Sequence, residues 1–359
     1  MSERDRWLRN VGLRGCEEIP CRVALSPAVW DQYRESLEKL VRRHPAIFGK
    51  YREKERKPWE KEYSPRYRRG EMWKDRWGCV WYNTYSGIAG QVVGHPLEDW
   101  GAFKDIKPPD PSKENDLEDL DWKEIAEDIR RAKEEGRVAR GGVCHGFLFQ
   151  RLYYLRGFEN LMVDIAERNE NLPRLIDIIL DYNMELVRRY LELGVDVVHF
   201  GDDLGMQERL TISPDDWRRY IKPAYAKIFG MCREAGAHVH FHSDGYIVDI
   251  MPDLVEIGVT ILNPQNLCNG LDNIERELKG KICIDLDIDR QKIIPWRTPE
   301  EVDSHILNCI KSLGSPQGGL MLVCGIYPGT PLENIEAVCE AMERYRRLWS
   351  ADGREIRWT

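Results

Sequence analysis

Beyond residue 140 the sequence repeats one pattern, in which short apolar runs ending in Gly or Asp are each followed by a longer amphipathic stretch. The apolar runs predict strands at residues 142–149, 196–202, 238–242, 260–263, 281–287 and 319–324. Two of the stretches between them, residues 173–193 and 214–235, begin at a proline and are predicted helices. Strands that alternate with helices in this way predict an α/β fold with a parallel sheet.

An open doubly wound sheet and a closed (β/α)8 TIM barrel both fit this repetition. No GxGxxG or GxxxxGK[ST] loop follows a predicted strand, so we expect the barrel. Two further strands must then come from the first 140 residues, where residues 77–82 (WGCVWY) are the best candidate. The predicted organisation is a helical, basic N-terminal extension (1–76), the barrel (77–350) with an acidic, proline-rich surface connection (97–136), and a tail (351–359).

Charge and composition exclude several classes of protein. The chain carries 53 Lys and Arg against 61 Asp and Glu, a net charge of −8, which argues against nucleic acid as a partner. No apolar run approaches the roughly 18 residues of a membrane span, and the first residues lack a signal-peptide core. The 10 Cys are dispersed without a CxxC pair, so disulfide staples are not expected. We expect a cytoplasmic protein without membrane contact, and a homodimer is allowed.

The predicted strand at residues 238–242 carries three histidines. His238, His240 and His242 alternate with Val and Phe, which places the three imidazoles on one face of the strand. The apolar face should pack on the outer helices, so the His face should point into the barrel with His242 nearest its mouth. The alternative is a set of hydrogen-bonded core histidines.

Carboxylates end two of the other predicted strands. Asp202 and Asp203 follow the strand at 196–202 and point in opposite directions, while Asp285 lies in the strand at 281–287. Carboxylates inside a barrel are costly unless they are paired or bind a metal. We therefore predict Asp202, Asp203, His240 and Asp285 as catalytic residues, with helix capping as the alternative for the Asp pair.

The last predicted strand ends at Cys324, which enters the loop Gly-Ile-Tyr-Pro-Gly-Thr-Pro at residues 325–331. Active sites of barrels lie at the carboxyl ends of the strands, so this thiol is placed at the mouth. A thiolate beside imidazole and carboxylate is a ligand mixture that zinc accepts. A buried structural cysteine is the alternative.

Five motifs resemble the uroporphyrinogen decarboxylase superfamily, in the order in which they occur there. They are GDDLG (201–205), SPDDWRRYIKP (213–223), HSDG (242–245), EIGVTILNPQ (256–265) and GTPLEN (329–334). The resemblance covers roughly residues 140–347 and implies a (β/α)8 barrel.

Within this superfamily the motifs resemble the zinc-dependent corrinoid methyltransferases more than the true decarboxylases. Residues 1–80 contain no match to the decarboxylases' M-R-Q-A-G-R segment, whereas residues 324–331 match the methyltransferases' C-G-I-x-P-x-T-P loop. The family's His-x-Cys is replaced here by His242, Ser243 and Asp244. The resemblance thus implies His242, Cys324 and Asp244 as metal ligands, with Asp203, Glu208 or His240 as substitutes for the third.

The implied activity is transfer of a methyl group between a small methylated or methoxylated, preferably aromatic, substrate and a corrinoid. The corrinoid would come on a partner protein, because the chain has no D-x-H-x-x-G cobalamin signature. A ligand set with oxygen suits Zn²⁺ that polarises an ether oxygen, which favours O-demethylation. The expected substrate-binding residues are His199, Asn263, Gln265 and Tyr327.

The sequence leaves three other functions open. The first is a decarboxylase-like lyase that uses Asp and Arg without metal. The second is a methylcobamide:thiol methyltransferase, and the third is a non-catalytic barrel that handles a corrinoid.

Overall fold

The computed structural model describes residues 1–51, 57–60 and 62–347. By its internal contacts the chain divides into two compact units. The first unit comprises residues 1–5, 71–82 and 90–262, and the second comprises residues 6–70, 83–89 and 263–359. The predicted tail at 351–359 lies outside the described residues, and the predicted boundaries at residues 76 and 350 remain predictions.

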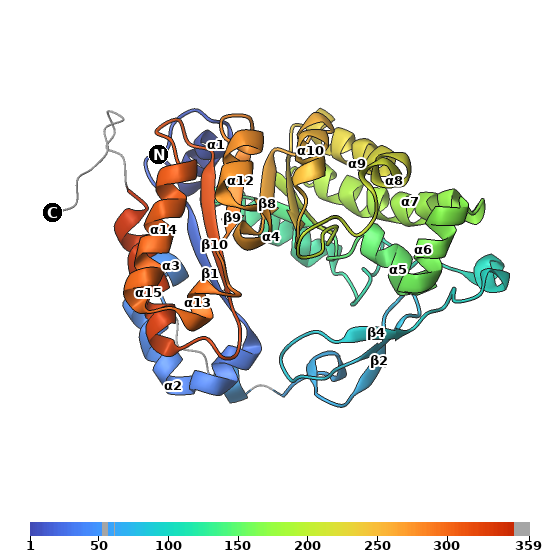
Figure 1. Ribbon diagram of the computed structural model, residues 1–359, viewed down its shortest axis with the longest axis horizontal. Helices are drawn as coiled ribbons and strands as arrows, with labels where there is room; N and C mark the ends of the chain where they lie inside the picture. Colours follow the sequence, from blue (N-terminus) through green and yellow to red (C-terminus); the bar gives the residue numbers. More distant parts are fainter. Residues whose placement is uncertain (52–56, 61, 348–359) are drawn as a thin grey trace. The chain divides into compact units, whose positions relative to one another are not determined.

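The first unit contains three parallel strands, β5 (Arg140–Gly142), β6 (Val197–Gly201) and β7 (His238–Ser243). The register places His199 beside His240, and Gly201 beside His242. Helices α7, α8 and α9 lie together in Figure 1, where they run from green to yellow. The helices of this unit are α4 (Trp122–Glu134), α5 (Phe149–Arg156), α6 (Phe158–Glu167), α7 (Asn171–Glu192), α8 (Pro214–Tyr220), α9 (Lys222–Glu234) and α10 (Met251–Glu256), with short 3-10 turns η3 (Trp100–Asp105) and η4 (Val248–Ile250).

The second unit contains the parallel strands β1 (Cys21–Leu25), β10 (Leu320–Ile326) and β9 (Cys283–Asp287), paired in that order. Helices α14 and α15 pack side by side, as Figure 1 shows in orange and red. The helices of this unit are α2 (Pro27–Arg43), α3 (Pro45–Phe48), α11 (Asn266–Asn269), α12 (Leu271–Leu278), α13 (Ile293–Trp296), α14 (Pro299–Leu313) and α15 (Leu332–Tyr345), with η1 (Pro58–Glu60) and η2 (Pro65–Tyr67). Helix α1 (Glu3–Val11) begins in the first unit and ends in the second.

Strand β8 (Ile261–Pro264) also begins in the first unit and ends in the second. Through it the strand order reads β1-β10-β9-β8-β7-β6-β5, so the described residues form a seven-stranded sheet. The predicted α/β class with parallel strands is confirmed. An eighth strand of this sheet is not found among the described residues, and closure into a (β/α)8 barrel remains a prediction.

Two strand predictions are wrong. The apolar run at 142–149 is not a strand beyond Gly142, because Phe147 and Leu148 are buried in the turn that leads into α5. Residues 77–82 do not supply a strand of the parallel sheet. Their only strand residues form β3 (Val80–Tyr82), which pairs antiparallel with β2 (Met72–Lys74) and β4 (Gln91–Gly94). Apolar runs of this length fit several buried environments, so periodicity alone cannot assign them.

Within the seven-stranded sheet, β1 is the strand that overlaps no predicted strand. It lies inside the predicted helical extension and pairs with β10 along its whole length. It has only five residues, and Arg22 interrupts its apolar run, so it carries little of the alternation that marks a strand.

The predicted helix at 214–235 is observed as two, α8 and α9. Its predicted start is confirmed, because the Ser213 side chain accepts a hydrogen bond from the Asp216 backbone N–H. The break comes at Ile221, just before Pro223 in the first turn of α9. No described helix of the chain is long and apolar enough to cross a membrane.

Candidate metal centre

Three potential metal ligands converge in the first unit. His145, Asp203 and His242 each offer one ligand atom, and these atoms all lie within 4.8 Å of one another. His145 Nε2 lies 3.1 Å from Asp203 Oδ2, and His242 Nε2 lies 3.7 Å from Asp203 Oδ1. The side chains of His145, Asp203 and His242 are 49%, 28% and 22% exposed, so an ion from solvent can reach the cluster.

A glycine makes room for His145. This histidine lies in the turn between β5 and α5, and its ring covers Gly201 at the end of β6. A Cβ atom at Gly201 would lie 2.5 Å from His145 Nδ1, closer than real Cβ atoms approach another atom. Gly201 is in register with His242. Because Gly201 has no side chain, the space beside His242 is free for the His145 ring, which occupies it.

The loops after β6 and β7 are joined by backbone hydrogen bonds. Asp202 N–H donates to the His242 carbonyl (3.0 Å), and Gly205 N–H donates to the Asp244 carbonyl (3.2 Å). The side chain of Asp203 accepts from the Asp244 N–H at 3.0 Å. These bonds hold Asp203 beside the strand that carries His242.

Two glycines permit this close approach. A Cβ at Gly245 would lie 2.2 Å from the backbone of Gly205, and a Cβ at Gly205 would lie 2.3 Å from the Tyr246 nitrogen. Gly245 also has φ +82°, a conformation that favours glycine. Side chains at either position would push the two loops apart.

The two neighbouring carboxylates differ in environment. Burial opposes ionisation of Asp203, but the hydrogen bond with His145 and the nearby His242 lower its pKa to about 2. Asp202 is fully buried, and its burial raises its pKa to about 6, although the backbone of Gln150 and the Tyr225 hydroxyl donate to it. Asp203 is therefore the carboxylate that is ionised and accessible at neutral pH.

Asp202 caps helix α5. Its carboxylate accepts from the backbone N–H groups of Leu148, Phe149 and Gln150 at 3.2, 2.5 and 2.8 Å, and from the Tyr225 hydroxyl at 2.8 Å. This is the capping arrangement that the sequence left open for the Asp pair. The predicted catalytic role of Asp202 stays a prediction.

The other predicted residues of the first unit lie around the cluster or beneath it. Asp244 Oδ1 lies 3.2 Å from His242 Nε2, the same ring nitrogen that faces Asp203 Oδ1, so its carboxylate lies beside the cluster. His240 and His199 lie one pleat below His242, with ring centroids 4.5 Å apart, and the Arg140 guanidinium lies 3.1 Å from His199 Nε2. Glu208 is exposed in the loop after β6.

The remaining predicted residues lie in the second unit or in the part of β8 that belongs to it. Asp285 is buried in β9, and the Asn263 side-chain amide donates to its carbonyl. The Gln265 side chain accepts a hydrogen bond from the Cys268 thiol. Cys324 is fully buried in β10, and burial raises the pKa of its thiol. Tyr327 is 44% exposed, and the Arg290 guanidinium lies over its ring.

His145 lies inside the predicted strand at 142–149 and was therefore not among the predicted site residues. The signal that could have located it is the composition of the segment, Gly-Gly-Val-Cys-His-Gly at residues 141–146. Glycines on both sides of a polar residue are typical of a turn. A turn directly after a strand places its side chains at the carboxyl edge of the sheet.

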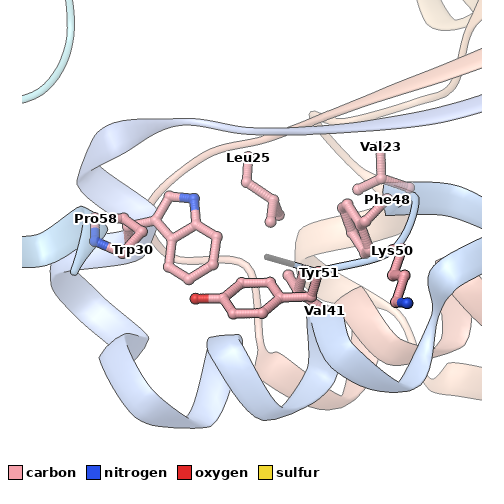
Figure 2. Close-up of a pocket in the computed structure, with 8 residues that line it drawn as sticks. All are labelled: Val23, Leu25, Trp30, Val41, Phe48, Lys50, Tyr51 and Pro58. Carbon is pink, nitrogen blue, oxygen red and sulfur yellow. The ribbon is translucent and has the colours of Figure 1, made fainter. Parts of the chain in front are cut away.

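A cavity of about 510 Å³ lies in the second unit (Figure 2). Most of its wall is apolar, and Figure 2 shows the rings of Trp30 and Tyr51 and the side chain of Leu25 around it. The lining residues are Val23, Leu25, Trp30, Val41, Phe48, Lys50, Tyr51 and Pro58. These lining residues include no carboxylate, imidazole or thiol.

The chemistry of this cluster fits a divalent transition metal. Two imidazole nitrogens and one carboxylate oxygen are ligands that zinc accepts, and three protein ligands leave a position open for substrate. The same ligand set also accepts Fe²⁺ and Co²⁺. The ionised Asp203 supplies the negative charge that such an ion needs.

Comparisons with known proteins agree with this architecture. The chain is 27% identical over 268 residues to uroporphyrinogen decarboxylase of Thermus thermophilus, covering 71% of this chain and 72% of that protein. It is 23% identical over 178 residues to methylcobamide:CoM methyltransferase MtbA of Methanosarcina mazei, covering 49% of this chain and 50% of that protein.

Among solved structures, a methyltransferase from Methanosarcina mazei matches with a TM-score of 0.54 at 18% identity, covering 75% of this chain and 76% of that one. This likeness shows the fold. The family model for uroporphyrinogen decarboxylase (URO-D) matches residues 81–345, which is most of the sequence. The chain therefore belongs to the uroporphyrinogen decarboxylase family.

Proposed function

We propose that this protein is a metal-dependent methyltransferase, which moves a methyl group between a small methoxylated substrate and a corrinoid carried by a partner protein. The observation that carries the proposal is the convergence of His145, Asp203 and His242 within 4.8 Å at the ends of neighbouring strands. The likeness to the methylcobamide:CoM methyltransferase supports the methyl-transfer chemistry.

His145, Asp203 and His242 would hold the metal, which we propose to be zinc. A bound zinc ion would supply Lewis acidity at the ether oxygen of the substrate, and the partner's corrinoid would supply the acceptor for the methyl group. Cys324 remains a proposed ligand on the resemblance alone. A (β/α)8 barrel closed by one further strand is the matching proposal for the fold.

The chain's own residues would prepare this site in three ways. Asp203 is ionised at neutral pH and contributes charge to the ligand set. Asp244 Oδ1 lies 3.2 Å from His242 Nε2, the nitrogen that faces Asp203, and would supply a further oxygen ligand to the same ion. The joined loops after β6 and β7 would keep the ligands in place before the ion arrives, which lowers the cost of organising the site.

Metal analysis and a methyl-transfer assay together test the proposal. We expect about one equivalent of zinc in protein purified without added metal. We also expect conversion of cob(I)alamin to methylcobalamin with at least one donor from a panel of methoxyarenes, methylamines and methyl thioethers. Conversion with a methylated thiol instead of a methoxyarene would assign the thiol methyltransferase activity.

A metal-independent decarboxylase is the second candidate, because uroporphyrinogen decarboxylases are among the chain's relatives. It predicts release of carbon dioxide from uroporphyrinogen by protein stripped of metal. That result, with no methyl transfer from any donor, would replace the methyltransferase proposal.

A further inference from the structure

The side-chain amide of Gln150 holds both the backbone and the carboxylate of Asp203. Gln150 is the second residue of α5 and is 6% exposed. Its Oε1 accepts from the Asp203 N–H at 3.0 Å, and its Nε2 donates to Asp203 Oδ2 at 3.2 Å. One amide group therefore holds both the main chain and the side chain of Asp203, while the Asp244 N–H holds the other carboxylate oxygen.

The amide is in turn held by two tyrosines. Gln150 Nε2 lies 3.0 Å from the Tyr153 hydroxyl and 3.1 Å from the Tyr154 hydroxyl. The Tyr154 ring packs edge-on against Tyr153 and Trp81, with centroids 4.8 and 5.0 Å apart. Because these aromatic rings pack against one another, the amide that they contact has little freedom to turn away from Asp203.

Charge makes Asp203 the strongest of these partners. Burial raises the pKa of Tyr153 to about 12 and also raises that of Tyr154, so both are neutral phenols at physiological pH. An ionised carboxylate accepts a stronger hydrogen bond than a neutral hydroxyl. The two N–H bonds of the Gln150 amide face three acceptors, of which Asp203 alone carries charge.

The main chain of Gln150 is fixed as well. Its N–H donates to Asp202 Oδ1 at 2.8 Å within the cap of α5. Gln150 thus bonds to both members of the Asp202–Asp203 pair, through its backbone to one and through its side chain to the other. Gln150 therefore joins the start of α5 to the end of β6, together with the N–H groups of Leu148 and Phe149.

We propose that Gln150 is a positioning residue for the metal ligand Asp203, and that it sets the metal affinity of the His145–Asp203–His242 site. The inference rests on the proposed function, because it requires that this cluster binds metal. Gln150 itself contacts neither metal nor substrate in this proposal. Hydrogen-bonding partners of metal ligands typically contribute 10–100-fold to affinity.

The test compares Gln150→Met with the wild-type protein after both are stripped of metal. Methionine has nearly the same length as glutamine but can make neither bond to Asp203. We expect the dissociation constants for Zn²⁺ and Co²⁺, measured by chelator competition, to rise about 10–100-fold. The visible absorption bands of bound Co²⁺ should also shift, since a rotated carboxylate changes the ligand field.

The matched control is Asn334→Leu in the second unit. Asn334 is also a buried amide, 2% exposed, but it donates only to the carbonyls of Ile294 and Arg297. Its replacement should change the dissociation constants less than threefold. If Gln150→Met does not fold, Gln150→Asn serves in its place, because it keeps an amide that is one methylene too short to hold both groups of Asp203.

The outcomes separate the two proposals. Wild-type protein that binds neither Zn²⁺ nor Co²⁺ would remove the proposed function and this inference with it. Wild-type binding that is matched by Gln150→Met, with the same Co²⁺ spectrum, would overturn only the role of Gln150.

Discussion

The polar strand ends of the two units have different neighbours. In the first unit, Asp203 lies beside two imidazoles, His145 and His242. In the second unit, Asp287 at the end of β9 is 3% exposed and lies 2.6 Å from the Arg290 guanidinium, three residues along the same chain segment. Both are carboxylates that end parallel strands, but their partners differ in chemistry.

The partner decides what the carboxylate is able to do. A guanidinium keeps its protons and offers no lone pair, so an Arg–Asp pair has no second ligand for a metal ion. An imidazole can lose its proton and then bind metal through nitrogen. A carboxylate at a strand end therefore suits a zinc-type site where an imidazole, and not a guanidinium, lies beside it.

The largest expected effect is the loss of a ligand from the first unit. His145→Ala and Asp203→Ala should each weaken zinc binding by more than about 100-fold, because removing a ligand costs more than the 10–100-fold of a supporting residue. Asp287→Asn should leave the affinity nearly unchanged. Isothermal titration with Zn²⁺ measures all three variants. A loss of zinc affinity in Asp287→Asn as large as in the two first-unit variants would contradict this contrast between the units.

The next effect concerns the glycines that let the two loops meet. Gly245→Ala should lower the free energy of unfolding by about 3 kcal/mol, from a strained φ and a clash with the Gly205 backbone. The matched control is Gly230→Ala in α9, where an added Cβ meets nothing within 4 Å. That change should stabilise the protein by up to about 1 kcal/mol. Urea denaturation measures both, and equal stability of the two variants would contradict the role assigned to Gly245.

A third measurement asks whether the second unit contributes a ligand. The resemblance to corrinoid methyltransferases predicts that Cys324→Ala weakens metal binding at least about tenfold. It also predicts that the variant loses the thiolate-to-cobalt charge-transfer band of Co²⁺-loaded protein. Retention of full affinity by Cys324→Ala would restrict the ligand set to the imidazoles and carboxylate of the first unit.

The smallest expected effect concerns the stability contributed by Glu38, a carboxylate of the second unit whose partners Arg42 and Lys57 stay protonated at acid pH. In the second unit, the hydrogen bond from Arg42 lowers the pKa of Glu38 to about 2, with a further contribution from Lys57. Because the pKa of Glu38 is lower in the folded protein than in the unfolded chain, its ion pairs stabilise the fold above pH 4.5. This contribution is lost as the pH falls from 4.5 to 2.

Glu38→Gln should accordingly cost at most about 1 kcal/mol at pH 7, since Arg42 is half exposed. The difference from the wild-type protein should shrink at pH 3. Calorimetric melting at the two pH values measures it. A stability difference that grew on acidification would contradict the lowered pKa of Glu38 in the folded protein.

Much of the fold was predictable because local periodicity reports local structure. The alternation of His with Val and Phe predicted β7, and Ser213 with Pro214 predicted the start of α8. The predicted candidates Asp203 and His242 do meet in one cluster. Strand β1 was not predictable in this way, because its pairing with β10 depends on residues about 300 positions further along the chain.

The sequence by itself determined which face of β7 carries the histidines, because a strand's two-residue period follows from backbone geometry. Only the tertiary structure decided that Asp203 faces the imidazoles while Asp202 caps α5. It also decided that His145 completes the cluster. The physical reason is that both outcomes depend on close approaches between segments that are distant in the sequence, at Gly201 and between Gly205 and Gly245. A glycine shows in the sequence that a Cβ atom is missing, but only the folded structure shows which segment occupies the space.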